Sequence, residues 1–464
     1  MTIGGTTTPP STVATSNYAK QTTMSYLARA NYSFRGRYLV TLTGRYDGNS
    51  ILAEGKKWDF FPSAGFAWVA SDEDFLKQYE FLNLLKARVS YGESGNAAIS
   101  SNNPLGLNPY ATQVTVTPSY YDFNGVTANG FSPSGLGNKN LTWEKTREYN
   151  AGLEISLFKG RISLDADYYN KTSRGSILVQ QIPAGNGFNS VLSNVGRVRN
   201  EGVELNLNTV NVTNSKFTWK TNINFAHNHN AILDLYGDGK DDVGNSWFIG
   251  QNVRSYYDYK VIGVWQTDEA VKAAEYGQKP GQWKLQDTNG DGKISSDDRV
   301  VLGNNSPKWF GGISNTVNFA NFDLNVTVYT RQGVTEYNQF LSAHEFGDEG
   351  RARYNSFNRS YWTPTNPTNE WANAAIEQDG NRRRASGYTD ASYTKISNIT
   401  LGYNVPKAMS GRFGVGSLRV YATAYNPFIF TNYVGWDPET ASLNTYGLQS
   451  FRTRTFLFGV NVSL

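Results

Sequence analysis

Apolar and polar residues alternate along much of this chain. Between residues 216 and 226, Phe217, Trp219 and Ile223 fall at odd positions, whereas Thr218 and Lys220 fall at even positions. Successive side chains of a β-strand point to opposite faces of its sheet. This segment is therefore expected to form a strand with one apolar face and one polar face.

Thirteen segments show this alternation, and turn-forming residues separate them. The expected strands cover residues 25–34, 37–49, 60–70, 85–95, 143–158, 161–181, 191–211, 216–230, 308–319, 322–337, 392–405, 417–431 and 451–464. Several exceed the roughly 9–11 residues that cross a bilayer, so we expect these strands to project beyond the membrane.

The alternation also sets the register of the strands. Leu164 and Ala166 alternate with Asp165 and Asp167, so a slip of one residue would move both carboxylates to the apolar face. The residues expected to face lipid include Leu164, Leu205, Phe217 and Ile223, and those expected to face the lumen include Asp165, Asn206 and Lys220.

Short and long connections take turns along the chain. The shorter ones lie near residue 36 and at 71–84, 159–160, 213–214, 320–321 and 404–416, and the long ones cover 97–142, 231–307, 338–391 and 432–450. A transmembrane β-barrel has short periplasmic turns at one rim and long extracellular loops at the other. The pattern therefore predicts an all-β fold, an antiparallel transmembrane barrel. The segment 71–84 is expected to be helical, because Ser71 and Asp74 are spaced as a helix-capping box.

The number of strands is odd, whereas bacterial single-chain barrels have even numbers. Outer-membrane transporters with a plugged lumen have about 22 strands, so a parent of this kind would have about nine further strands and a plug upstream. Residues 1–23 are rich in Thr, Ser and Pro and lack the features of a signal peptide. We therefore expect residues 1–464 to be the C-terminal part of a larger barrel.

Composition supports a barrel and excludes several other classes. Aromatic residues reach 14%, including 29 Tyr, and mean hydropathy is −0.50. Tyr and Trp suit both membrane interfaces, and no run approaches the roughly 20 apolar residues of a spanning helix. The chain has no Cys, and its net charge of +4 is too small and scattered to indicate a nucleic-acid partner. No catalytic constellation stands out, so we expect a protein that is not an enzyme.

One segment has the spacing of an EF-hand calcium loop. Its expected ligands are Asp287, Asn289, Asp291, Lys293 through its carbonyl, Ser295 and Asp298. Asp298 replaces the usual Glu, and its shorter reach weakens bidentate binding. The alternative is a metal-free turn rich in Asx and Gly. A calcium ion here would be structural and would stiffen the expected extracellular loop at 231–307.

Aromatic residues gather in the same long loop. They are Trp247, Phe248, Tyr256, Tyr257 and Trp265. An aromatic face can stack on the apolar face of a sugar ring, which would make these residues a substrate-binding site. Packing between large loops is an equally good interpretation.

Several stretches resemble the SusC/RagA-type TonB-dependent outer-membrane transporters of Bacteroidetes. They are residues 61–68 with 72–76, 85–96, 141–145 with 150–154, 194–196 with 200–204, and 287–298 with 303–304. The resemblance covers the C-terminal half of such a protein. It implies energised uptake of oligosaccharides or peptides across the outer membrane. It also implies a SusD-like surface lipoprotein over the barrel, and a TonB–ExbB–ExbD complex that acts through the N-terminal part.

Two other functions are compatible with the sequence: a passive outer-membrane porin and a secreted β-rich glycan-binding protein. A porin would lack the plug. A secreted protein would bury the apolar faces of its strands in a core. For a barrel, the remaining expected partners are outer-membrane lipid and lipopolysaccharide.

Overall fold

The structure is a computed structural model of the chain. It describes residues 20–97, 113–123, 126–338, 341–342, 360–373, 375–376, 378–435, 437–440 and 452–463, with the side chains of 113–134, 186, 383 and 413 excepted. Residues 1–19 and 98–112 lie outside this range, as do Phe451 and Leu464 of the last expected strand.

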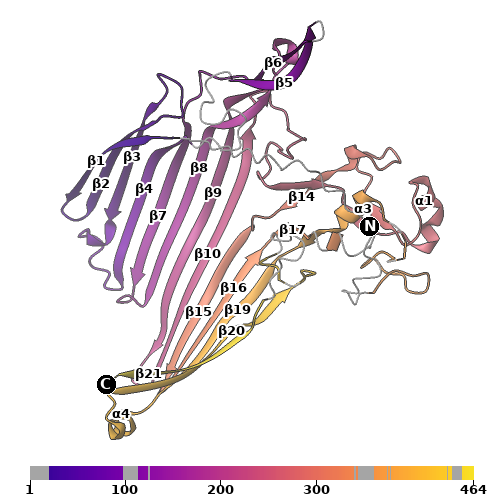
Figure 1. The fold of residues 1–464 in the computed structure, drawn as a ribbon. Helices are drawn as coiled ribbons and strands as arrows, with labels where there is room; N and C mark the ends of the chain where they lie inside the picture. The colour runs from indigo at the N-terminus through magenta and orange to yellow at the C-terminus, as the bar shows by residue number, and fades with distance from the viewer. Residues whose placement is uncertain are drawn as a thin grey trace, which may run out of the picture.

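One antiparallel sheet of thirteen strands dominates the described residues (Figure 1). In spatial order the strands are β1 (Thr23–Phe34), β2 (Tyr38–Asn49), β3 (Trp58–Val69), β4 (Leu82–Asn96), β7 (Glu144–Leu157), β8 (Ile162–Gln181), β9 (Ser190–Thr213), β10 (Phe217–Asp234), β15 (Trp309–Phe319), β16 (Phe322–Gln332), β19 (Tyr393–Asn404), β20 (Ser417–Thr431) and β21 (Thr455–Ser463). All thirteen expected strands are present, which confirms the fold class. β1 and β21 have one neighbour each, so the sheet curves without closing.

The expected register is confirmed. Leu205 of β9 lies opposite Ala166 of β8 and Phe225 of β10, which gives a continuous apolar row across three strands. The neighbouring Asn206 lies opposite Asp165 and therefore belongs to the other face.

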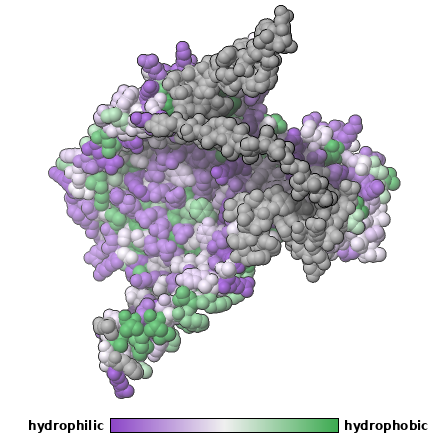
Figure 2. All heavy atoms as spheres, viewed as in Figure 1, coloured by the Kyte–Doolittle hydropathy of each residue, from purple (hydrophilic) through white to green (hydrophobic). Residues whose placement is uncertain are grey.

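The two faces of the sheet differ in chemistry. Large apolar side chains stand exposed on one face, among them Leu42, Phe66, Val89, Ile313, Val420 and Phe458. Ion pairs occupy the other face, and the view in Figure 2 is mainly hydrophilic across the middle of the sheet. Exposed apolar surface on this scale indicates contact with lipid or protein. The exposed apolar face is therefore called the outer face. The charged face is called the luminal face.

Turns and loops lie at opposite edges of the sheet (Figure 1). At the turn edge, tight connections such as the one joining β1 to β2 contain residues with positive φ, here Arg35 at 54° and Gly36 at 70°. The long connections all leave from the other edge, the loop edge. This division matches the alternation expected from the sequence.

The segment 71–84 is not the helix that its capping-box spacing predicted. It contains a single 3₁₀ turn, η1 (Ala70–Asp72), and no side chain caps it. Glu73 instead accepts hydrogen bonds from Arg37 at 2.8 Å, Tyr38 at 2.5 Å and Trp68 at 3.2 Å. These three contacts hold the turn against the ends of β2 and β3, and they compete with local helix formation.

The expected strand 322–337 is also interrupted. It ends as β16 at Gln332 and resumes as β17 (Thr335–Tyr337), which pairs with β18 (Tyr388–Asp390) outside the main sheet. Gly333 breaks it with a φ of 73°, a conformation that side chains rarely adopt. The Ser392 hydroxyl accepts a hydrogen bond from the Gly333 N–H at 2.9 Å, which replaces the lost strand partner.

Smaller elements fill the long connections. The short strands are β5 (Gln113–Phe123), β6 (Val126–Gly135), β11 (Ser255–Asp258), β12 (Val261–Val264), β13 (Trp283–Leu285) and β14 (Val300–Asn304). The helical segments are η2 (Ala184–Asn186), η3 (Thr267–Glu269), α1 (Ala270–Glu275), η4 (Ser296–Asp298), α3 (Gly380–Ser386), α4 (Lys407–Ser410) and η5 (Gly411–Phe413). No helix among the described residues is long and apolar enough to span a bilayer.

Candidate functional site

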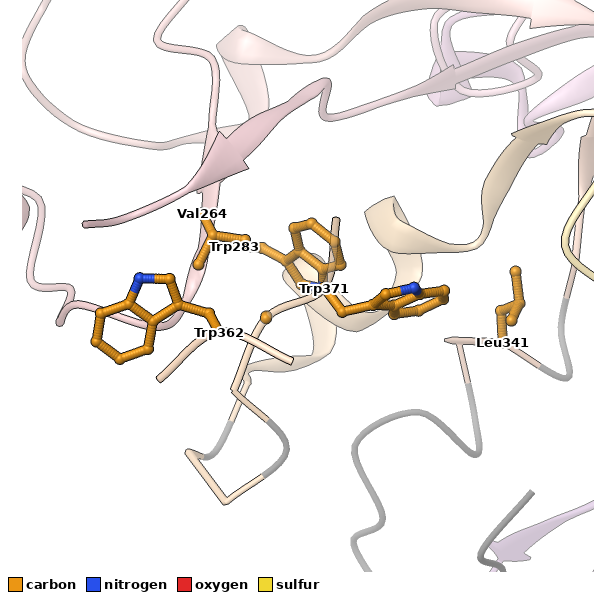
Figure 3. Close-up of a cluster of buried hydrophobic side chains, with 6 residues drawn as sticks. Val264, Trp283, Leu341, Trp362 and Trp371 are labelled. Carbon is orange, nitrogen blue, oxygen red and sulfur yellow. The ribbon is translucent and has the colours of Figure 1, made fainter. Parts of the chain in front are cut away.

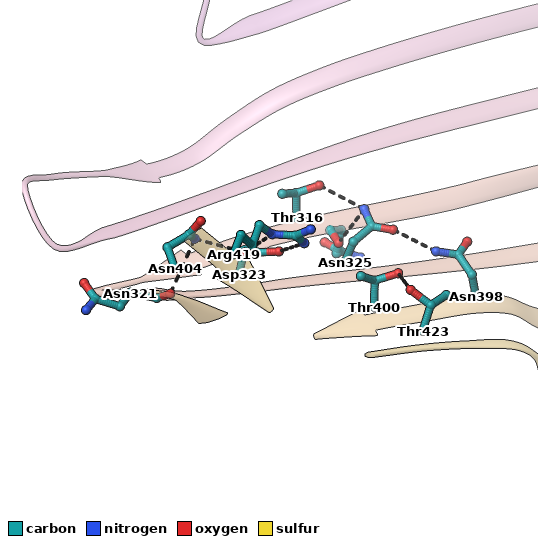
Figure 4. A network of polar contacts seen from close by, with 10 residues as sticks. Thr316, Asn321, Asp323, Asn325, Asn398, Thr400, Asn404, Arg419 and Thr423 are labelled. Carbon is teal, nitrogen blue, oxygen red and sulfur yellow. Dashed lines mark hydrogen bonds and ion pairs between the residues drawn. The ribbon is translucent and has the colours of Figure 1, made fainter. Parts of the chain in front are cut away.

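Charged side chains on the luminal face reach across intervening strands. Arg419 of β20 donates from Nε to Oδ1 of Asp323 of β16 at 2.9 Å, over the backbone of β19 (Figure 4). The position between them is Gly402, where a Cβ would come within 2.5 Å of both side chains. Glycine therefore leaves the space that lets the ion pair bridge three strands.

A second ion pair repeats this arrangement farther along the sheet. Arg88 of β4 contacts Asp167 of β8 at 2.5 Å. Gly152 of β7 lies between them, and a Cβ there would lie 2.3 Å from the Arg88 Nε. Buried charges are stable only when they are paired or hydrated, so a face cross-linked in this way suits a water-filled lumen.

A lumen-facing cavity of about 380 Å³ lies nearer the loop edge. Lys395 of β19 contacts Glu439 at 2.6 Å, and the Tyr393 hydroxyl donates to the same carboxylate at 2.9 Å. Burial raises the pKa of Glu439, but the Lys395 and Tyr393 donors outweigh it and leave the pKa below its usual value. The cavity thus offers charged, hydroxyl and aromatic groups, including Tyr329, to a ligand in the lumen.

Two long connections fold together at the loop edge. Residues 231–307 and 338–391 share a buried cluster made of Val264, Trp283, Leu341, Trp362, Trp371 and Ala372 (Figure 3). The described parts of these two connections are called the loop unit. They contribute to one core although β15 and β16 separate them in the chain.

Hydrogen bonds reinforce this shared core. The Val264 N–H donates to Oδ1 of Asn369 at 2.9 Å, and the Trp362 indole N–H donates to Oε1 of Gln266 at 2.8 Å. Buried polar groups without partners are costly, so these bonds fix how the two connections meet. The loop unit is therefore an ordered platform beside the mouth of the curved sheet.

An ion pair between the buried Asp258 and the half-exposed Arg384 joins β11 of one connection to α3 of the other. The Arg384 Nη2 lies 3.0 Å from Oδ1 of Asp258, and the Tyr388 hydroxyl donates to Oδ2 at 3.1 Å. The hydrogen bond to Asp258 raises the pKa of Arg384. Burial, followed by the charge of Asp258, raises the pKa of Tyr388. Both donors therefore remain protonated, and the pair acts as a clamp.

A second buried carboxyl lies beside this clamp. Glu336 of β17 accepts a hydrogen bond from the Tyr256 hydroxyl at 3.0 Å. Burial raises the pKa of Glu336, and burial together with the charge of Glu336 raises the pKa of Tyr256 to about 12. The centroid of the Tyr256 ring lies 5.4 Å from that of the Tyr388 ring, and the rings are tilted by 54°, so the two polar contacts meet at one aromatic pair.

The EF-hand-like segment forms a tight, internally bonded loop. Asp287 accepts hydrogen bonds from the N–H groups of Gly290 at 2.7 Å and Gly292 at 2.9 Å. Partial burial raises the pKa of Asp287, but these backbone donors outweigh it and leave the pKa below its usual value. The fully buried Asp298 accepts from the N–H groups of Thr288 and Ser295, both at 2.8 Å.

The donor set of this loop consists of carboxylate, amide, hydroxyl and carbonyl oxygens, which suits a hard cation such as calcium. In the described residues, however, no three His, Asp or Glu side chains are arranged to hold a metal. The carboxylates of Asp287 and Asp298 are turned toward backbone N–H groups instead. Calcium binding therefore stays a prediction.

Comparison with known proteins settles the family. The family model described as TonB dependent receptor-like, beta-barrel matches residues 2–427. The chain belongs to the TonB-dependent receptor family. Its resemblance to SusC and RagA is also confirmed, and members of this group are outer-membrane proteins.

Relatives with curated names resemble nearly the whole chain. TonB-dependent receptor P26 of Formosa agariphila is 34% identical, over 98% of this chain and 47% of the relative. TonB-dependent receptor SusC of Bacteroides thetaiotaomicron is 30% identical, over 96% of this chain and 44% of SusC. The chain thus spans about half the length of the curated relatives it matches.

Solved structures show the same fold. The RagAB peptide importer in its open-open state matches with a TM-score of 0.76 and 23% identity, over 96% of this chain and 47% of the matched chain. A second structure, titled as the RagAB peptide transporter, gives a TM-score of 0.73 at 24% identity, over 95% of this chain and 48% of the other.

The aromatic residues proposed for sugar stacking do not form one surface in this TonB-dependent receptor. Phe248 and Tyr257 come together with their ring centroids 4.6 Å apart. Tyr256 joins the clamp, and Trp265 is only 2% exposed. Trp247 pairs through its backbone with Asp242. Stacking on a sugar ring therefore stays a prediction mainly for the pair Phe248 and Tyr257.

Sequence reasoning missed the luminal cavity. The alternation places Tyr329 and Lys395 on the luminal face, and the register sets them directly opposite each other. The face and the pairing of these two residues could have been predicted from the alternation. Glu439 comes from a loop more than forty residues farther along, and no local signal indicates where its side chain lies.

Proposed function

We propose that this chain forms the barrel wall and extracellular loops of a TonB-dependent importer of oligosaccharides or peptides. The observation that carries the proposal is the sheet itself. It has an exposed apolar outer face and a luminal face cross-linked by ion pairs, in a member of the TonB-dependent receptor family. A face of fixed charges suits the passage of polar solutes better than that of apolar ones.

The substrate class and partners follow from the relatives. SusC and the RagAB peptide importer are similar over nearly the whole of this chain, and the second is named for peptide uptake. On this basis we assign a SusD-like lipoprotein as the partner at the loop edge. A TonB–ExbB–ExbD complex is assigned as the energy source.

Deletion of the gene tests the proposal and separates the two substrate classes. Cells that lack the receptor should lose growth on one class, either defined oligosaccharides or defined peptides, as the sole carbon source. Growth on a monosaccharide should be unchanged and serves as the control. Unchanged growth on every oligosaccharide and peptide tested would remove the basis for an importer.

We also propose that the segment from Asp287 to Asp298 binds a structural calcium ion. Without a cation, its carboxylates repel one another at short range. Replacing both Asp287 and Asp291 with alanine should therefore increase proteolysis within 231–307 and leave the barrel folded.

The matched control is Asp238→Ala, at an exposed loop tip of the same connection outside the segment. The wild-type receptor should also become more sensitive to protease when a chelator is added. If chelation changes nothing and no calcium co-purifies, the segment is a turn without a metal.

A further inference from the structure

A single register row forms the wall of the luminal cavity near the loop edge. Asn224 of β10 lies opposite Gly312 of β15. Gly312 lies opposite Tyr329 of β16, and Tyr329 lies opposite Lys395 of β19 (Figure 1). All four residues line the cavity of about 380 Å³. Four adjacent strands therefore place an amide, a gap, an aromatic ring and an ammonium group side by side.

The gap in this row comes from Gly312. A Cβ at this position would lie 3.2 Å from the carbonyl oxygen of Val328 and 3.3 Å from the amide nitrogen of Asn224. A larger side chain would enter the space between Asn224 and Tyr329. Small-ligand pockets have volumes of roughly 300–1,000 Å³, so the space that remains is large enough for a small ligand. The cavity lined by this row is called the wall recess.

Neutral polar groups in the wall recess are free to bind a ligand. The side chains of Asn224, Tyr329 and Ser397 line it and form no hydrogen bond to any residue that the structure describes. An amide, a phenol and a hydroxyl group each offer both a donor and an acceptor. The Tyr329 ring adds apolar surface to these groups. The wall recess thus suits a ligand that has many hydroxyl groups and an apolar face.

The charged groups of the wall recess are paired with each other. Lys395 and Glu439 are the charged residues that line it, and the Lys395 Nζ lies 2.6 Å and 2.8 Å from the two carboxylate oxygens of Glu439. Charged groups that leave water are stable only when they are paired. A carboxylate, a sulfate or an ammonium group of a ligand would therefore have to break this ion pair. A neutral ligand leaves it intact.

We propose that the wall recess is a subsite for one neutral sugar ring of a transported oligosaccharide, and that Asn224 and Tyr329 determine this specificity. The Tyr329 ring contacts the apolar face of the sugar, and Asn224 and Ser397 form hydrogen bonds with its hydroxyl groups. Tyr329 is three residues from Gln332 at the end of β16, roughly 10 Å from the loop edge, where a solute from outside arrives first. The inference rests on the proposed import function and narrows its substrate class.

Calorimetric binding of a ligand panel to the whole purified receptor tests this proposal. The panel holds neutral hexasaccharides of several linkages, hexasaccharides with carboxylate or sulfate groups, and hexapeptides. We expect a neutral hexasaccharide to bind most tightly. Tyr329→Ala should weaken its binding about tenfold, and Asn224→Leu about fivefold. The control Tyr421→Ala removes a tyrosine that packs against Arg419 outside the wall recess, and it should bind as the wild type does.

Three outcomes would overturn the subsite: tightest binding by a charged hexasaccharide or a hexapeptide, no binding of any neutral hexasaccharide, or wild-type affinity in both variants. Heat-modifiable migration checks folding, and the exposed Asn224 can be replaced without loss of a hydrogen bond to a described residue. Growth of cells that lack the gene separates this inference from the import function. A growth defect on peptides alone would refute the subsite and leave import in place, whereas unchanged growth on all substrates would remove import itself.

Discussion

Replacing Arg384 with alanine should destabilise the loop unit by roughly 3 kcal/mol, at the lower end of the range for breaking a buried ion pair. The remaining Asp258 is almost fully buried and would keep its charge with only the Tyr388 hydroxyl and a backbone N–H as donors. We expect a destabilisation at the lower end of this range because the Arg384 side chain is 47% exposed and already partly hydrated.

Hydrogen exchange in β11 and α3 measures this effect. A loss of this size should speed exchange by local opening about a hundredfold. Combining Asp258→Asn with Arg384→Ala removes both charges and should recover much of the loss. If the single variant exchanges at the wild-type rate, Asp258 and Arg384 do not clamp the two connections.

Replacing Leu205 with arginine should destabilise the barrel by about 2–4 kcal/mol, the cost of a cation facing lipid near the bilayer midplane. Leu205 lies in the apolar row between Ala166 and Phe225. No carboxylate therefore lies directly opposite position 205 to pair with a new cation. Heat-modifiable migration of the whole receptor in detergent, followed by urea titration in vesicles, measures the change.

Asn206→Arg is the matched control because the neighbouring residue faces the lumen beside Asp165. This variant should retain wild-type stability. The register would be inverted if Asn206→Arg were the destabilising change and Leu205→Arg the neutral one.

Much of the fold could be predicted because period-two alternation is a strong signal wherever the two faces meet different solvents. In β8 and β9, Asp165 and Asn206 alternate with Leu164 and Leu205, and the structure keeps that register. The alternation does not predict where one residue ends a strand or prevents a helix. At Gly333 a left-handed backbone ends β16, and at Glu73 three side chains outcompete helix formation.

The candidate site was less predictable because its contacts are distant in sequence. Trp283 and Trp371 pack in one core, and Asp258 forms an ion pair with Arg384. In each pair, more than eighty residues separate the two partners in the sequence. No local pattern encodes such pairs.

Uptake of labelled substrate in cells with and without TonB tests the central claim most directly. The substrate is the oligosaccharide or peptide whose use requires the receptor gene. An energised importer should lose uptake when TonB is absent, although the receptor remains folded in the outer membrane. Uptake that continues at the wild-type rate without TonB would show a passive channel and would contradict the proposed function.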